Sequence, residues 1–165
     1  MKLLLRSTLL IALLLTGCGF HLKDTDVGVL PTRMHVLSDD AALMQVVSQH
    51  LQVRGTQVVQ VTAAELVYPL LELEDTERSR RPLVLDQAGR PTRFNLQIST
   101  RFRFSPESGE YFFIPLQISK AIDSDVDQST AADQLEQSTW QYLLQSMSSL
   151  ILTQLSYLSA SSMEQ

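Results

Sequence analysis

The 165-residue chain contains one cysteine, Cys18, so it cannot form an internal disulfide. Its three histidines, His21, His35 and His50, are widely separated and lack the spacing that zinc ligands show. The chain has no Gly-x-Ser-x-Gly nucleophile motif and no phosphate-binding glycine loop, and its six glycines are scattered. These absences argue against catalysis, and we expect a protein that is not an enzyme, has no metal site and needs no cofactor.

Basic side chains are in the minority. The chain has 13 lysines and arginines against 18 aspartates and glutamates, and two of the basic residues, Lys2 and Arg6, lie at the N-terminal end. This balance argues against nucleic acid as the main partner, because binding to phosphate backbones favours a net basic surface. After the first 17 residues, no apolar run approaches the ~20 residues of a membrane-spanning helix.

The N-terminus has the pattern of a cleaved secretory signal. Two basic residues accompany an apolar run that extends to Leu15, and small residues precede Cys18. Leu15-Thr16-Gly17-Cys18 resembles the bacterial lipobox, in which the cysteine is acylated and becomes the first mature residue. We therefore predict a lipoprotein signal peptide over residues 1–17, lipidation of Cys18 and a polar tether over 18–31. The alternative is an ordinary signal peptide followed by an incidental buried cysteine.

The first part of the body predicts a short strand at 33–37 and an amphipathic helix at 41–54. Apolar residues recur in the helix at the i, i+3, i+4, i+7 spacing of one face. Asp40 and the two residues before it offer N-cap oxygens, and Gly55 suits the left-handed conformation that ends helices. His50 lies on the apolar face, where we expect it to be a hydrogen-bonded core histidine.

Strands dominate the middle of the chain. Even-numbered residues of 93–104 are apolar except Thr100, and odd-numbered residues are polar, which predicts a strand with one buried face. A hairpin partner follows at 111–120, where Pro115 suggests a free edge. Other short strands are expected at 56–61, 66–75 and 83–85. In the second of these, Leu70 and Glu72 are expected to share a face, and Pro69 suggests an edge or a bulge.

The longest predicted helix covers 129–158 and is followed by a flexible tail at 159–165. It has a broad apolar stripe and an opposite face of glutamines and serines, with no lysine or arginine after Lys120. Such a neutral face is easily desolvated and suits contact with another protein, although neutral drift on a solvated face explains it equally well. Together these elements predict a single α+β domain over 32–158. Its mainly antiparallel sheet of about four strands has two helices packed on one face.

Arginines are concentrated around the turn at 86–89. If its flanks pair as a hairpin, five guanidinium groups gather at one end of the sheet, and Arg101 and Arg103 continue a basic stripe along the next strand. Guanidinium groups bind phosphates through paired hydrogen bonds. We therefore predict an anion-binding site; the alternative is an arginine-rich turn that serves only solubility. The five site residues are Arg78, Arg80, Arg81, Arg90 and Arg93.

The opening Cys18-Gly19-Phe20-His21-Leu22-Lys23-Asp24 and the order of elements resemble the LptE family of lipopolysaccharide-assembly lipoproteins. The resemblance implies two helices on a four-stranded sheet and a plug inside the lumen of the outer-membrane barrel protein LptD. It further implies that the protein assists folding of that barrel and binds lipopolysaccharide. Gly19, in place of an aspartate after the lipidated cysteine, fits sorting to the outer membrane. Gln87 and the start of the last helix at 129–133, which has no cation, depart from the family, whose basic residues there are associated with lipopolysaccharide.

We therefore expect a lipid-anchored outer-membrane lipoprotein of a Gram-negative bacterium on the periplasmic side or in a barrel lumen. Its expected partners are an LptD-like barrel and lipopolysaccharide, which the five arginines would bind through phosphates. The alternative is a generic periplasmic scaffold lipoprotein that recruits envelope proteins without binding lipid.

Overall fold

The computed structural model describes residues 30–59, 69–106, 112–123 and 129–163. The predicted signal peptide, Cys18 and almost all of the tether lie outside the described residues. So do parts of the strands predicted at 56–61 and 66–75, the turn after residue 106 and the loop before the last helix. The described elements are β1 (Arg33–Ser38), α2 (Ala41–Val53), β2 (Gln57–Val59), β3 (Leu70–Leu85), β4 (Pro91–Ser105), β5 (Phe112–Asp123) and α3 (Ser129–Met163).

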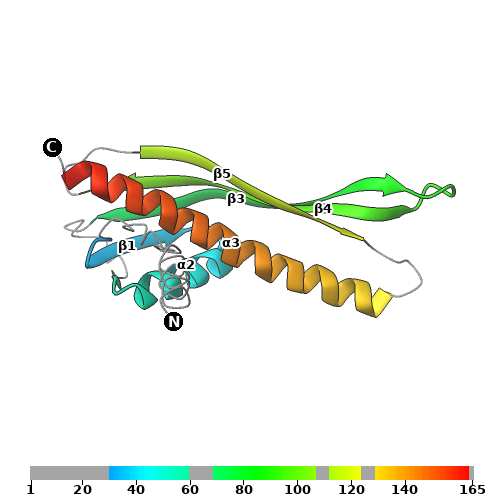
Figure 1. The fold of residues 1–165 in the computed structure, drawn as a ribbon, viewed down its shortest axis with the longest axis horizontal. Helices are drawn as coiled ribbons and strands as arrows, with labels where there is room; N and C mark the ends of the chain where they lie inside the picture. Colours follow the sequence, from blue (N-terminus) through cyan, green and yellow to red (C-terminus); the bar gives the residue numbers. More distant parts are fainter. Residues whose placement is uncertain (1–29, 60–68, 107–111, 124–128, 164–165) are drawn as a thin grey trace, which may run out of the picture.

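The strands form one sheet in the order β2-β1-β3-β4-β5, and both helices pack with it (Figure 1). β1 is parallel to both β2 and β3, whereas β3, β4 and β5 are antiparallel to their neighbours. The predicted α+β class is confirmed, with five strands in place of about four. The short β2, which lies within the strand predicted at 56–61, extends the sheet beside β1.

The helix α2 begins and ends as its sequence predicts. The carboxylate Oδ1 of Asp40 accepts the N–H of Leu43 at 2.8 Å, which satisfies a donor of the first turn. After the helix, Gly55 has φ +87°, and its N–H donates to the carbonyl of Gln52 at 3.0 Å. His50 is half-buried and hydrogen-bonded through Nδ1 to Ser148 Oγ of α3 at 2.9 Å, which confirms it as a core histidine.

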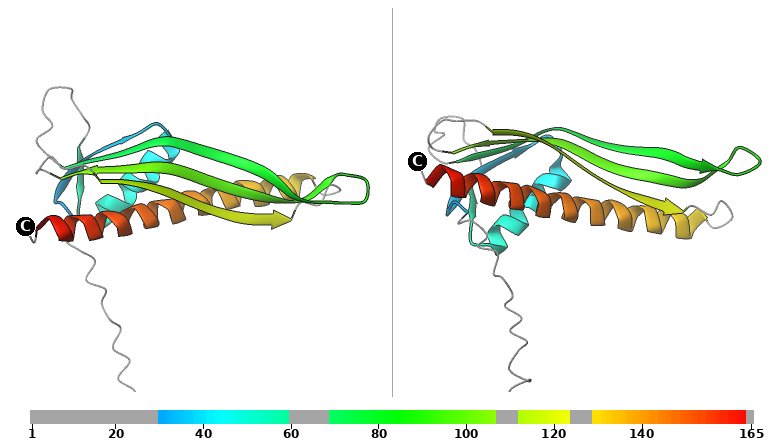
Figure 2. Two further views of the ribbon diagram at one scale, coloured as in Figure 1. Left: turned by 90° about the horizontal axis from the view of Figure 1, so that it is seen from above. Right: turned by 45° about the horizontal axis from the view of Figure 1, so that its top comes forward.

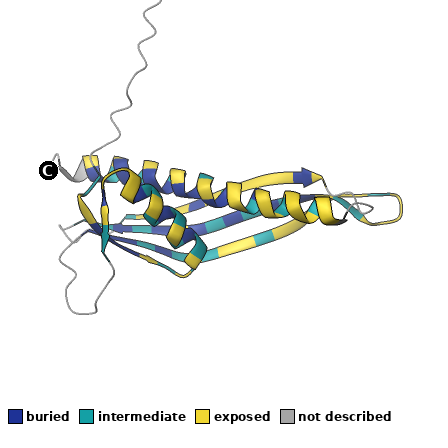
Figure 3. Cartoon of the chain, turned by 90° about the horizontal axis from the view of Figure 1, so that it is seen from below, coloured by how far each residue is buried: buried dark blue, intermediate teal, exposed yellow. Residues whose placement is uncertain are grey.

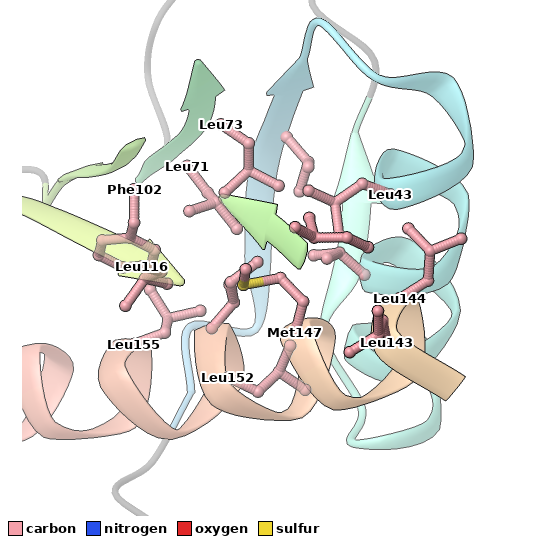
Figure 4. Packing of buried hydrophobic residues seen from close by; sticks show 14 of the residues in the cluster. Leu43, Leu71, Leu73, Phe102, Leu116, Leu143, Leu144, Met147, Leu152 and Leu155 are labelled. Carbon is pink, nitrogen blue, oxygen red and sulfur yellow. The ribbon is translucent and has the colours of Figure 1, made fainter. Parts of the chain in front are cut away.

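The core lies between the sheet and the two helices, where buried leucines from α2, β3 and α3 meet around Phe102 and Met147 (Figure 4). The alternation predicted for β4 is confirmed, since its even-numbered residues are buried from Phe94 to Phe104. Their cross-strand neighbours on β5 are buried or half-buried, except the exposed Lys120 opposite Leu96, and continue this layer. Complete burial of an aliphatic or aromatic side chain contributes about 1.5–3 kcal/mol, so this layer accounts for much of the stability.

Thr100, the one polar residue on the apolar face of β4, forms hydrogen bonds to a bulge in β3. The register of the two strands shifts between Glu74 and Glu77, and Asp75 has φ +51°. The hydroxyl of Thr100 lies 3.0 Å from Thr76 Oγ1 and donates to the carbonyl of Glu74 at 3.2 Å. The N–H of Thr76 donates to Asp39 Oδ2 at 3.0 Å. The buried threonine therefore satisfies polar groups that a regular ladder would have paired.

β3 differs from its predicted form in several respects. It is one 16-residue strand, not a strand at 66–75 followed by another at 83–85. Leu70 and Glu72 share a face, as predicted, but it is the face away from the helices, whereas Leu71 and Leu73 face the core. Pro69 is neither at an edge nor in a bulge: it comes just before an interior strand, where its carbonyl accepts the N–H of His35 at 2.9 Å.

The last helix is longer than predicted and runs to Met163, through most of the segment predicted as a tail. Leu155 is fully buried and Ser159 is 3% exposed, so packing continues beyond the predicted end at Leu158. The expectation that Pro115 marks a free edge is confirmed, because β5 is an outer strand of the sheet. Among the described residues, no helix has both the length and the hydropathy of a membrane span.

Candidate ligand-binding hairpin

The turn between β3 and β4 is held by Asp86. Its Oδ1 accepts the backbone N–H groups of Ala88 and Arg90, each at 2.8 Å, and its Oδ2 accepts Arg90 Nε at 2.8 Å. Gly89 has φ +78°, a conformation that glycine adopts without strain. The hydrogen bond from the Arg90 N–H is the main reason that the pKa of Asp86 lies below its ordinary value of 3.8. The turn is therefore rigid, and the charge of Arg90 is partly neutralised within it.

The hairpin forms as predicted, but the structure divides its arginines between two faces. Arg78 and Arg80 have Ile98 and Leu96 as Cα partners on β4, and these two side chains are fully buried on the helix-facing side. Directly opposite residues of an antiparallel pair point to the same face. Arg78 and Arg80 therefore face the helices.

Both helix-facing arginines form ion pairs with carboxylates at the helices. Arg78 Nη2 lies 2.6 Å from Oδ2 of Asp40, the N-cap of α2. Arg80 Nε lies 3.0 Å from Glu136 Oε2 on α3, and its guanidinium carbon is 3.4 Å from the centroid of the Phe94 ring. These contacts fasten the hairpin to both helices. Arg78 and Arg80 are thereby separated from the other three predicted site residues.

The remaining strand arginines lie on the face away from the helices. Arg81 is opposite Asn95, which shares a face with Arg93 two residues earlier. Arg93 Nε is 3.5 Å from Asp123 Oδ1, and the two side chains are 51% and 83% exposed, so this pair is weak and easily exchanged. Within the described part of the chain, the guanidinium group of Arg81 makes no side-chain hydrogen bond and no ion pair. Together with Arg90 at the turn, these residues supply the cations of the hairpin tip.

The basic stripe predicted along Arg101 and Arg103 is neutralised by acidic residues of β3. Arg103 Nη1 lies 3.0 Å from Glu72 Oε2, and Arg101 pairs with Asp75 and, at 3.7 Å, with Glu74. Glu72, Glu74 and Asp75 of β3 therefore supply the counter-charges. Among the arginines of β3 and β4 on this face, those outside these pairs lie at the hairpin tip.

The structure also exposes three aliphatic residues that the sequence analysis treated only as a strand. Leu83, Val84 and Leu85 are 54%, 47% and 58% exposed. The sequence contains a signal for this exposure. The strand residues after the turn, 91–93, are Pro, Thr and Arg, which offer little apolar surface to cover Leu83, Val84 and Leu85. We call residues 83–85 the aliphatic ridge.

A groove of about 670 Å³ opens between the hairpin and the first half of α3. Several of its polar side chains already interact within the protein. Trp140 Nε1 donates to Glu136 Oε1 at 3.3 Å, and Glu136 also forms an ion pair with Arg80. Of the lining residues, Asp133 has no ion pair within the described part of the chain. The lining residues are Arg78, Asp133, Glu136, Gln137, Trp140, Gln141 and Leu144.

One side of α3 is exposed at intervals along the helix (Figure 3), and from Gln137 to Ala160 its exposed residues are neutral, as the sequence predicts. No charged residue occurs between Gln137 and Ala160, and Tyr142 and Tyr157 are 52% and 68% exposed. Tyrosine is enriched in protein interfaces, and uncharged side chains are inexpensive to desolvate. Among the described residues, no group of histidine, aspartate or glutamate side chains is arranged to hold a metal ion.

Comparison with known proteins relates the fold to bacterial lipoproteins. No protein-family model matches the chain, and a search of curated protein sequences found no significant match. Rare lipoprotein B from Shewanella oneidensis superposes with a TM-score of 0.69 at 16% identity, covering 81% of this chain and 99% of that one. Lipoprotein B from Nitrosomonas europaea gives 0.70 at 17% identity, covering 88% and 96%. A minor lipoprotein from Acinetobacter baumannii gives 0.56 at 15% identity, covering 78% and 93%. The chain thus has the fold of these lipoproteins.

Proposed function

We propose that the chain is a non-enzymatic, lipid-anchored lipoprotein of the Gram-negative outer membrane. It plugs an LptD-like lipopolysaccharide translocon, assists assembly of that barrel and binds lipopolysaccharide for delivery to the cell surface. The observation that carries the proposal is a lipobox-like sequence ending at Cys18 on a chain with the fold of rare lipoprotein B, whose solved examples are LptE-like. The LptE-like opening residues 18–24 point to the same family.

The neutral outer face of α3 supports a role as an enclosed plug. A helix that faces bulk water normally carries interspersed charges, which favour solubility. On this helix the exposed positions from Gln137 to Ala160 are glutamine, serine, threonine, alanine and tyrosine. These side chains can exchange hydrogen bonds with water for hydrogen bonds with a barrel wall without the cost of burying a charge. We assign this face to contact with the barrel.

The hairpin tip supports lipopolysaccharide binding. Of the five arginines considered, we assign Arg81 and Arg93 to phosphate binding, since carboxylates hold Arg78 and Arg80 on the helix side and Arg90 within the turn. Arg81 has no competing carboxylate within the described residues, and the exposed partner of Arg93 is easily displaced. Guanidinium groups bind phosphate oxygens through charge-assisted, paired hydrogen bonds.

Charge reversal at the tip tests the binding claim. In Arg81→Glu/Arg93→Glu, lipopolysaccharide affinity should fall roughly ten-fold or more, because hydrogen bonds to charged groups contribute about 1.5–3 kcal/mol each. The loss should be larger at 20 mM than at about 1 M salt, where the screening length is only ~3 Å. Arg54→Glu, the same change at an exposed residue after α2, should bind normally. Unchanged affinity in the double variant would leave the tip arginines with a role only in solubility or barrel contact.

A further inference from the structure

The aliphatic ridge is exposed on both faces of the strand that carries it. Regular alternation would turn every second residue of β3 towards the helices, yet Leu83, Val84 and Leu85 are each about half exposed. The register with β4 shifts between Pro82 and Val84 and again between Val84 and Leu85. Neither orientation therefore brings one of these side chains into the core.

The position of the ridge explains its exposure. The β3–β4 hairpin extends beyond the ends of both β5 and α3, so its outermost part projects from the body (Figure 2). β5 ends at Asp123, which is level with Val84 because both have Arg93 as a Cα partner. Beyond this row, no further strand and no helix of the described part of the chain accompanies the hairpin (Figure 2). Intramolecular packing does not require aliphatic residues at this point, and polar residues would form the same two-stranded ribbon.

Three consecutive aliphatic residues on a projecting hairpin are unfavourable in solution because their apolar surface is exposed to water. Each keeps about half of its surface in water, and exposed apolar strands promote aggregation. Exposed apolar surface of this kind typically marks a place that another molecule covers. Covering the ridge would recover part of the roughly 25 cal/mol per Å² that apolar burial contributes.

The surroundings of the ridge indicate which kind of molecule covers it. Val84 has Arg93 as its Cα partner on β4, and Arg81 precedes the ridge by two residues on β3. Aliphatic and cationic groups thus lie within a few residues of each other at one end of the molecule. A neutral protein groove would leave the guanidinium group of Arg81 without an anionic partner, whereas an anionic amphiphile satisfies both kinds of group.

We propose that the aliphatic ridge contacts the acyl chains of lipopolysaccharide while Arg81 and Arg93 bind its phosphates. This inference rests on the proposed function and adds to it the part of the ligand that the arginines do not recognise. The tip then holds lipopolysaccharide at the junction between its sugar phosphates and its lipid. It is more selective for complete lipopolysaccharide than a purely basic turn.

The test separates the two parts of the ligand. Leu83→Thr/Val84→Thr/Leu85→Thr removes aliphatic surface, and the β-branched threonines favour the strand conformation. The full lipidated chain is placed in phosphatidylcholine nanodiscs and titrated with intact lipopolysaccharide, with the same material after chemical removal of its acyl chains, and with short-chain phosphatidylglycerol. Val53→Thr, at an 86% exposed residue at the end of α2, is the control for lost apolar surface.

The expected result is a roughly ten-fold loss of affinity for intact lipopolysaccharide in the triple variant, from partial burial of three aliphatic side chains. Affinity for the deacylated form should not change, and Val53→Thr should match the wild type. Equal losses for both forms, or no loss, would overturn the acyl contact while leaving the proposed function intact. Wild-type affinity for phosphatidylglycerol equal to that for lipopolysaccharide would overturn the assignment to lipopolysaccharide. Failure of the wild type to bind either form of lipopolysaccharide would instead remove the lipid-binding part of the proposed function.

One further outcome distinguishes a protein partner. If the triple variant binds intact lipopolysaccharide normally but no longer purifies with a barrel protein, the ridge docks on protein and the acyl contact is wrong. Circular dichroism and urea unfolding of the variant should match the wild type, because the ridge contributes little to the core. A variant that fails to fold is replaced by Leu83→Thr alone, whose loss for intact lipopolysaccharide should be smaller and in the same direction.

Discussion

Arg78 donates to both carboxylate oxygens of Asp40, at 2.9 Å to Oδ1 and 2.6 Å to Oδ2, while Oδ1 also accepts the N–H of Leu43 at 2.8 Å. One aspartate thereby caps α2 and ties its first turn to the middle of β3. An arginine that sequence assigned to anion binding is in fact part of the connection between helix and sheet.

Asp40→Ala should lower the free energy of unfolding by about 1–2 kcal/mol, because it removes an N-cap and an ion pair together. Arg78→Ala should cost less, about 0–1 kcal/mol, since the arginine side chain is 36% exposed and the cap survives. Urea unfolding measures both, with Asp123→Ala as the control at an 83% exposed residue. A smaller loss for Asp40→Ala than for Arg78→Ala would contradict the capping role.

Thr100→Val should destabilise the protein by about 1 kcal/mol despite making the apolar face of β4 uniform. Valine has nearly the same shape but cannot bond the carbonyl of Glu74 or the hydroxyl of Thr76. Thr92→Val, whose hydroxyl makes a long 3.5 Å bond to the carbonyl of Val84, should be close to neutral. If Thr100→Val unfolds at higher urea than the wild type, the threonine is not holding the bulge.

The hairpin turn should loosen in acid. The folded pKa of Asp86 lies below 3.8, so its hydrogen bonds stabilise the turn fully above that pH. The stabilisation is lost as pH falls through the lowered folded value. Amide exchange at Ala88 and Arg90 should therefore show a protonation step below pH 3.8 in the wild type and none in Asp86→Asn. The same step in Asp86→Asn would assign it to another group.

Arg80 and Arg81 are adjacent in sequence and should respond in opposite ways to substitution. Arg80→Gln loses its ion pair with Glu136 and its stacking on Phe94, so the free energy of unfolding should fall by about 0.5–2 kcal/mol. Its lipopolysaccharide affinity should change little. Arg81→Gln should lower affinity and leave stability within about 0.5 kcal/mol. The reverse pattern would place the binding site on the helix side of the hairpin.

Local patterns predicted much of the fold. Alternation over 93–104 identified the buried face of β4, and the capping residues placed α2 within one residue at its C-terminal end. In both cases the physical cause acts between near neighbours along the chain. The same applies to His50, whose place on the apolar helix face correctly indicated a hydrogen-bonded core residue.

Features that depend on contacts between distant segments were not predictable in this way. The bulge at Asp75 depends on hydrogen bonds with Asp39 and Thr100, which lie on other segments of the chain. The carboxylates that hold Arg78 and Arg80 come from residues 38 and 56 positions away. The exposure of the aliphatic ridge arises because the hairpin extends past its neighbours, which sequence spacing does not encode (Figure 1).

Affinity purification from mildly solubilised outer membranes tests the proposed function most directly. The tagged full-length chain should purify with one stoichiometric partner whose mobility in gel electrophoresis changes on heating, as folded β-barrels do. Cys18→Ala should abolish acylation and reduce recovery from the membrane fraction, which tests the anchor separately. An eluate without any heat-modifiable barrel, from a chain that is acylated and membrane-bound, would contradict the plug and leave a periplasmic scaffold lipoprotein.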